Sequence, residues 1–361
     1  MATLLCAARV FDGHSFTEPK DVIIRDGTIE SISSHTGQPH DNAVLIDADG
    51  QYLVPGFIDC HVHIRDQSQL AAHANHGVTT VLDMGSWPAS LVDSFRGLPG
   101  MPDYLAAGPP AFPPGGHAAK STMIPRSFVV GSEDDAVGFV RSRVMEKTDY
   151  VKIICEDDCD PSPIRKLASE AKLAGKTSIA HTVSTKTFQL ALEADVDVIT
   201  HAPLDDDLSE ALVAAMKRSG KVSVPTLVMM QAVAQRPKKL RPADDVQHAV
   251  ESVRRLHAAG VPILAGTDSN EGVPGGPAEV KHGESYAVEL RLLESAGLTP
   301  LEVLQSATSW PAEHLGLRDR GSVVVGNRAD LVLLAENPLT GIAALQKIAS
   351  VWCHGVQVRN A

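Results

Sequence analysis

The middle of the chain repeats one pattern, in which a short apolar run of strand type is followed by a loop and usually by a helical segment. Eight strand-like runs occupy residues 56–60, 78–82, 103–107, 150–154, 177–181, 197–201, 221–225 and 261–265. Helical patterns between them cover residues 162–174, 186–194, 207–218 and 243–259. Eight strands alternating with helices over about 260 residues match the size of a (β/α)8 TIM barrel, whose reactive groups sit at the C-terminal ends of the strands. We therefore predict an α/β fold with a catalytic barrel over residues 55–315.

The two ends of the chain have a different pattern of polar and apolar residues. Short runs of alternating polarity at residues 4–7, 21–25 and 28–32, and again at 329–334 and 351–358, predict strands. Asp26-Gly27 lies between two of these runs and is a strong hairpin signal. Because chain termini usually lie close together in a compact domain, both ends can complete one unit. We predict a small β-sandwich domain built from residues 1–54 plus 316–361.

Composition narrows the class of protein further. Only 4% of the 361 residues are aromatic, so the core must be built from Ala, Val, Leu and Ile, which suits a parallel sheet covered by helices. The formal net charge of −12 repels nucleic-acid phosphates and anionic membranes. Five scattered cysteines do not form a disulfide pattern, and we find neither a signal peptide nor an apolar span of membrane length. We expect a cytoplasmic homo-oligomer that acts on a small molecule, without nucleic-acid or membrane partners.

Potential metal ligands follow several of the predicted strands. His61 and His63 close the first strand, and residues i and i+2 of a strand point to the same face, so both imidazoles can reach one metal. Two unrelated histidines remain an alternative for such a pair alone. His181, His201 and Asp268, however, lie at or just past the ends of the fifth, sixth and eighth strands. The predicted barrel would bring all five side chains to one end.

Lys152 lies inside the apolar fourth strand, where an unpaired ammonium group is costly to bury. A partner carboxylate would explain it. Alternatively, a buried amine with a lowered pKa becomes neutral and reactive. Physical reasoning favours the ion pair and leaves both explanations open.

These residues together resemble a known family. Residues 54–63 resemble the opening barrel strand of the metal-dependent amidohydrolase superfamily, and residues 321–332 resemble its return into a small β-sandwich. The order His-x-His, Lys152, His181, His201, Asp268 is similar to that of its two-metal members. Within the superfamily, the chain looks most like the prolidase, imidazolonepropionase and ochratoxinase branch, on the residues Gly115-Gly116-His117, Val183 and Glu193.

The resemblance implies roles for the individual residues. His61 and His63 would hold one metal with Asp268, and His181 and His201 would hold a second, with carboxylated Lys152 as the bridge. Imidazoles and carboxylates suit Zn²⁺, although they also accept Mn²⁺, Co²⁺ or Fe²⁺. Asp268 would be the catalytic proton shuttle. His117, on the loop after the third strand, would bind the substrate, unless it is a surface histidine.

The implied reaction is hydrolysis of a small amide, such as an N-acyl amino acid, a dipeptide or a cyclic amide, by a metal-bound hydroxide. A lactonase, esterase or phosphoester hydrolase with the same metals is an alternative, because this kind of site activates water without dictating the electrophile. A non-catalytic scaffold of the same fold is disfavoured because every expected ligand is present. A mononuclear deaminase is also disfavoured, since such members carry a His-x-x-Glu signature and residue 184 here is Ser184.

Overall fold

The computed structural model describes residues 2–36, 43–116, 124–236, 243–273 and 278–360. Two parallel sheets form its centre. One has the order β6-β7-β8, and the other has the order β12-β11-β10-β9. Their strands are β6 (Phe57–Val62), β7 (Val78–Asp83), β8 (Asp103–Ala106), β9 (Tyr150–Ile154), β10 (Thr177–His181), β11 (Val198–Thr200) and β12 (Val222–Val224).

Isolated bridges join these sheets to one another and to residues 261–269. Ala111 pairs with Ile153 beside β9, Ser223 of β12 pairs with Ile263, and Val62 of β6 pairs with Ser269. The prediction of a regular strand at residues 261–265 was wrong. Pro262 has no N–H group, so it accepts a bond from Ser223 N but cannot donate one to extend the ladder.

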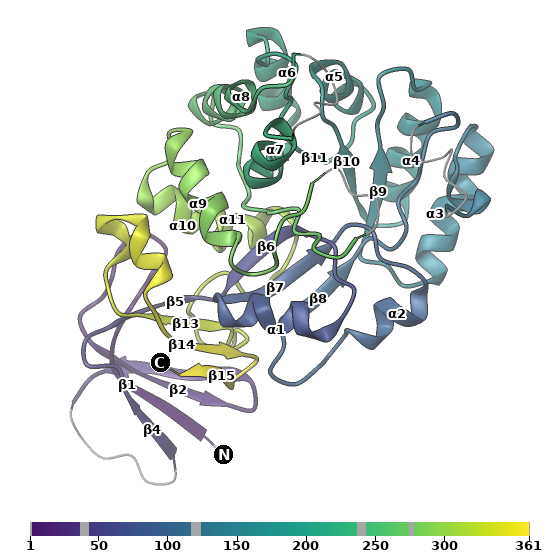
Figure 1. Ribbon diagram of the computed structural model, residues 1–361. Coiled ribbons are helices and arrows are strands. Elements are labelled where there is room, and N and C mark those ends of the chain that lie inside the picture. The colour runs from purple at the N-terminus through teal and green to yellow at the C-terminus, as the bar shows by residue number, and fades with distance from the viewer. Residues whose placement is uncertain (1, 37–42, 117–123, 237–242, 274–277, 361) are drawn as a thin grey trace.

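Helices follow most of the parallel strands. They are α1 (Gln67–Asn75), α2 (Ala89–Ser94), α3 (Glu133–Met145), α4 (Pro161–Leu173), α5 (Thr185–Glu193), α6 (Glu210–Ser219), α7 (Leu227–Ala234), α8 (Val246–Ala258), α9 (Tyr286–Ser295), α10 (Pro300–Ser306) and α11 (Ser309–His314). The four predicted helices correspond to α4, α5, α6 and α8. Helix α6 starts three residues later than predicted, because Ser209 caps it by accepting a bond from Leu212 N. In Figure 1, α3, α4, α5, α6 and α8 lie outside the parallel strands.

Strands from both ends of the chain form one eight-stranded sheet. Its order is β15-β14-β13-β5-β1-β2-β3, and β4 pairs with β1. The strands are β1 (Ala2–Val10), β2 (Lys20–Arg25), β3 (Thr28–Ser34), β4 (Ala43–Asp47), β5 (Tyr52–Pro55), β13 (Leu331–Leu334), β14 (Ile348–Cys353) and β15 (Val356–Asn360). The predicted hairpin at Asp26-Gly27 is confirmed: β2 and β3 are antiparallel, and both turn residues have positive φ.

The eight-stranded sheet leads directly into the first parallel strand. Only Gly56 separates β5 from β6, and its N–H donates to Asp330 O, in the residue before β13, at 2.7 Å. A Cβ at Gly56 would stand 2.0 Å from Thr79 Oγ1, so a side chain cannot fit there without displacing β7. The chain ends therefore pack against the strand that carries the His-x-His pair.

Deletion of residues 316–361 is expected to abolish cooperative folding. Strand β13 pairs with β5, and Leu53, Leu331 and Trp352 share one buried cluster, so the deletion exposes the apolar face and the edge of the remaining strands. Solubility and denaturant unfolding of the truncated chain measure this. A soluble, active and cooperatively unfolding truncated chain would contradict it.

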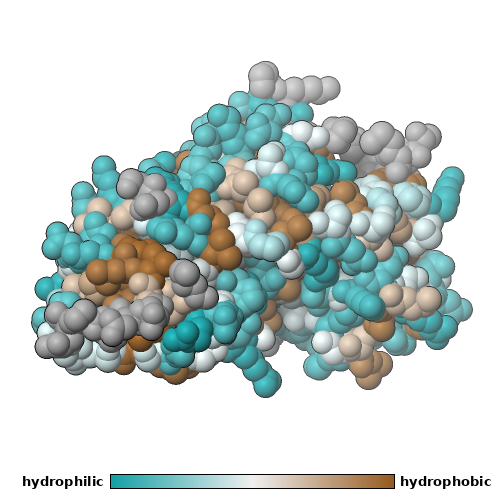
Figure 2. All heavy atoms as spheres, turned by 90° about the horizontal axis from the view of Figure 1, so that it is seen from below, coloured by the Kyte–Doolittle hydropathy of each residue, from teal (hydrophilic) through white to brown (hydrophobic). Residues whose placement is uncertain are grey.

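Several large apolar side chains of the described residues are exposed on the surface. Figure 2 shows apolar side chains gathered toward the left of this face, at the end of the molecule where the eight-stranded sheet lies in Figure 1. The exposed large apolar residues of the described chain include Leu45 of β4, which is 64% exposed. Among the described residues, no helix has both the length and the apolar character needed to cross a bilayer.

Candidate functional site

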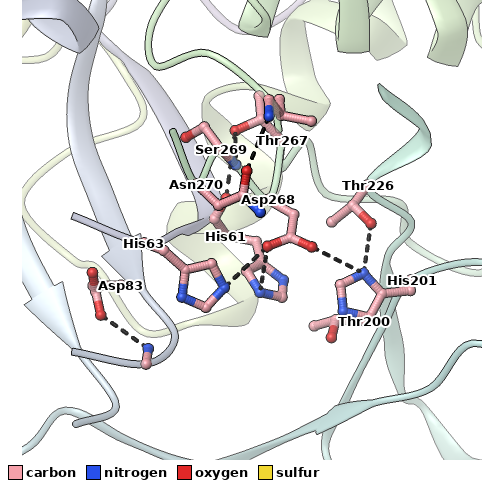
Figure 3. A network of polar contacts seen from close by, with 12 residues as sticks. His61, His63, Asp83, Thr200, His201, Thr226, Thr267, Asp268, Ser269 and Asn270 are labelled. Carbon is pink, nitrogen blue, oxygen red and sulfur yellow. Dashed lines mark hydrogen bonds and ion pairs between the residues drawn. The ribbon is translucent and has the colours of Figure 1, made fainter. Parts of the chain in front are cut away.

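Four of the predicted ligands converge at the C-terminal ends of the parallel strands. Figure 3 shows the Asp268 carboxylate between His61 and His63 on one side and His201 on the other. Asp268 Oδ1 lies 3.5 Å from His61 Nε2 and 3.0 Å from His63 Nε2. Asp268 Oδ2 lies 3.8 Å from His201 Nδ1. Side chains separated by up to 207 positions in the sequence thus surround one carboxylate.

His181 and Lys152 complete the predicted set from the neighbouring strands. His181 ends β10, and its ring centroid is 4.4 Å from that of His201. Lys152 lies in the middle of β9 and is buried, and its Nζ donates to Thr200 Oγ1 at 2.9 Å. Within the described chain, Nζ makes no ion pair within 4 Å. The ion pair favoured from the residues alone is therefore absent there.

Three of the nine described non-glycine residues with positive φ lie at this end of the strands. His201, Thr226 and Asp268 have φ values of 71°, 47° and 57°, in the left-handed region that non-glycine residues rarely adopt. All three follow a parallel strand or the segment bridged to one. Such strain persists only where surrounding contacts hold it, and it clusters at functional sites. The local conformation directs these side chains into the site.

Burial keeps the imidazoles of His61, His181 and His201 in the neutral form that binds metals. Desolvation lowers the pKa of His181 to about 3 and holds the pKa values of His61 and His201 well below the usual range, and the Lys152 charge acts in the same direction. Desolvation also lowers the pKa of Lys152 to about 7, while Asp268 and Cys155 oppose this. A neutral imidazole presents a lone pair, which metal coordination requires.

The donor set fits divalent metal ions. His201 Nε2 is buried and has no hydrogen-bond partner within the part of the chain that the structure describes. Ligand atoms of His61, His201 and Asp268 all lie within 4.8 Å of one another. Two atoms bound to one tetrahedral Zn²⁺ at 2.0–2.1 Å stand about 3.3 Å apart, which is close to the distances from Asp268 Oδ1 to the His61 and His63 nitrogens. Imidazole and carboxylate ligands favour Zn²⁺ and related transition metals.

Three supporting residues had not been identified from the sequence. Thr226 Oγ1 lies 2.7 Å from His201 Nδ1 and fixes that ring. Buried Asp59 accepts bonds from His61 N, Thr267 N and Thr267 Oγ1, and desolvation raises its pKa to about 7. Asp83 accepts a bond from Ile64 N, directly after the His-x-His pair. Asp59 could have been found, because it alternates with His61 and His63 in an apolar strand.

The chain offers two further candidates. His117, the predicted substrate-binding residue, lies outside the described residues. A second cluster of possible ligands, Asp206, Asp207 and His248, is at least partly exposed. Asp207 in that cluster is already paired with Arg255 at 2.7 Å and with His248 at 2.7 Å. That cluster is a surface network of ion pairs.

Comparison with known proteins gives consistent matches. The model of the Amidohydrolase family matches residues 52–358. Adenine deaminase 2 of Desulfotalea psychrophila is 25% identical over 383 residues, which cover 98% of this chain and 55% of that protein. The chain thus spans about half the length of the curated relatives it matches first.

Two solved structures extend the comparison. A Xaa-Pro dipeptidase with methionine bound in its active site has a TM-score of 0.84 at 23% identity, over 99% of each chain. Ochratoxinase of A. niger has a TM-score of 0.79 at 19% identity, over 99% of this chain and 96% of that one. These likenesses concern the fold. They agree with the superfamily resemblance seen in the sequence, which is confirmed.

Proposed function

The chain belongs to the amidohydrolase family, and we propose that it is a two-metal hydrolase that cleaves the C–N bond of a small amide. N-acyl amino acids, dipeptides and cyclic amides are the substrate classes. The observation that carries the proposal is the convergence of three imidazoles on the Asp268 carboxylate at the strand ends. We further propose that residues 55–315 form one closed (β/α)8 barrel and that residues 1–54 and 316–361 form a β-sandwich domain.

The ligand roles follow from the arrangement. His61, His63 and Asp268 would hold one metal, and His181 and His201 would hold the other. Lys152, carboxylated on Nζ, would bridge the two. Two divalent ions, proposed to be Zn²⁺, supply polarisation of the scissile carbonyl and a water of lowered pKa when they are bound.

The protein's own groups would then manage the proton. The Asp268 carboxylate would accept a proton from the attacking water at one oxygen. It would return that proton to the leaving nitrogen as the C–N bond breaks. General acid–base transfer of this kind contributes about 10²–10⁴-fold to the rate. The partly exposed ring of His63 and the buried Asp268 place this step where the strands open to solvent.

A second candidate reaction is deamination, which also breaks a C–N bond by adding water. It is favoured by the adenine deaminase match, which covers 98% of this chain. A hydrolysis panel of dipeptides, N-acyl amino acids, cyclic amides, adenine, a lactone and a phosphotriester separates these reactions. Amide turnover above the others supports the proposal, and turnover confined to adenine, the lactone or the phosphotriester contradicts it.

Purified protein is expected to bind two divalent metals per chain under metal-replete conditions. Five ligand side chains and Lys152 at one end of the strands form a set too large for a single tetrahedral ion. Elemental analysis measures the ratio, and removal by a chelator followed by Zn²⁺ or Mn²⁺ addition tests reversibility. A ratio of one or less would refute the two-metal site.

A further inference from the structure

Helix α7 begins at the end of β12 with an N-terminus that its own N-cap residue leaves free. A threonine at this position ordinarily accepts a bond from an N–H group of the first helical turn. Thr226 makes no such bond. Its hydroxyl group instead lies 2.7 Å from His201 Nδ1, as Figure 3 shows. The hydroxyl that would cap the helix is used to hold a predicted metal ligand.

A residue from another helix takes over the capping. Glu289 of α9 accepts bonds from Leu227 N at 3.1 Å and from Val228 N at 2.7 Å, one on each carboxylate oxygen. Its exposed fraction is 0%. A carboxylate at a helix N-terminus is stabilised by the free N–H groups and by the helix dipole. Burial raises the pKa of Glu289 to about 8, and the two bonds act against this rise.

Helix α9 also contacts the strand that carries the other ligands. Tyr286 donates its hydroxyl proton to Ile58 O of β6 at 2.8 Å. Tyr286 and Glu289 are three residues apart and therefore share one face of α9. That face joins the β6 strand of His61 and His63 to the start of α7.

We propose that Glu289 is a positioning residue for His201. By capping α7 in place of Thr226, it leaves the Thr226 hydroxyl free to accept a bond from His201 Nδ1. With its proton on Nδ1, His201 presents the lone pair of Nε2, the buried nitrogen without a partner among the described residues, to the second metal. The inference rests on the proposed function and adds to it a residue outside the ligand set.

Glu289→Gln tests this link. Glutamine keeps one acceptor but places an NH₂ group against the other α7 N–H, so the Thr226 hydroxyl is drawn to the helix end and releases His201. The affinity for the second metal is expected to fall about 10–100-fold, as for other partners of ligating histidines. Competition with a chromophoric chelator, using Zn²⁺ and the full chain, measures both sites without any substrate.

Glu302→Gln is the matched control. Glu302 also binds a helix N-terminus, accepting a bond from Thr299 N at 2.8 Å, but it belongs to α10 and touches no predicted ligand. The Glu302→Gln variant should lose thermal stability without losing metal affinity. If Glu289→Gln does not fold, Glu289→Asp keeps the carboxyl group and is too short for both N–H groups. The same loss of the second metal is expected for it.

Coupling between variants completes the test. Thr226→Val should lower the affinity for the second metal as Glu289→Gln does. Thr226→Ser keeps the hydroxyl group and should keep the wild-type affinity. In the Thr226→Val background, Glu289→Gln should add little further loss, because both act through His201. Wild-type metal affinity in Glu289→Gln, or additive losses in the double variant, would overturn the inference alone. A wild-type chain that binds fewer than two metals would overturn the proposed function with it.

Discussion

Asp268→Asn is expected to lower kcat by about 10²–10⁴-fold with KM little changed, because the variant keeps the shape of the side chain and loses the proton acceptor. The carboxylate oxygens lie within 3.8 Å of ring nitrogens of His61, His63 and His201. Steady-state kinetics on the best substrate, at saturating metal, measure the effect.

Asp160→Asn is the control for this substitution. Asp160 caps α4 by accepting a bond from Ser162 N, and asparagine caps helices about equally well. Its kcat should therefore equal that of the parent. The metal content of the Asp268 variant shows which role was lost. Unchanged metal content indicates loss of the proton acceptor alone, and reduced content indicates loss of a ligand. An Asp268→Asn enzyme within tenfold of the parent would refute the shuttle role.

The positions of the ligands were predictable because they depend on a simple rule of parallel sheets. The C-terminal ends of neighbouring parallel strands lie on one side, so side chains at those ends meet however far apart they are in the sequence. His61, His63 and His201 lie together for this reason. The hairpin at Asp26-Gly27 was also predictable, because an Asp-Gly pair readily adopts the two adjacent positive φ values that such a turn requires.

The contacts that orient the ligands were not predictable, because they join side chains through pairings that leave no local signal. Lys152 finds Thr200 across an intervening strand, since β10 lies between β9 and β11. Glu289 binds an N–H group 62 positions earlier in the chain. The single lysine in an apolar strand suggested a carboxylate partner. Within the described chain, the Lys152 amine instead donates a hydrogen bond to the Thr200 hydroxyl. Register between distant segments decides such contacts.

Lys152→Ala is expected to abolish activity and to leave one metal per chain. In the proposed site this side chain is the bridge between the two ions, so its removal takes away a ligand from each. Burial holds the pKa of Lys152 at about 7, so a substantial share of the amine is neutral near neutral pH. Acetate or propionate should restore part of the activity of the alanine variant by occupying the bridging position.

Carboxylation explains the lysine better than a bare amine does. In the proposed reaction, the neutral Nζ would attack the carbon of CO₂, a C–O π bond would open to an oxygen anion, and the nitrogen would release one proton to solvent. The carbamate would offer two oxygens as metal ligands, in place of an amine whose hydrogen-bond partner among the described contacts is the Thr200 hydroxyl.

Lys152→Arg separates the bridge from a simple cation. Arginine keeps the positive charge and the length but does not form a carbamate, so it should lose a metal and activity as alanine does. Wild-type protein prepared with ¹³C-bicarbonate should show a carbamate carbon by NMR, and the arginine variant should not. An arginine variant that retains two metals and activity would show that the site needs only a cation at position 152, and the carboxylated bridge would have to be abandoned.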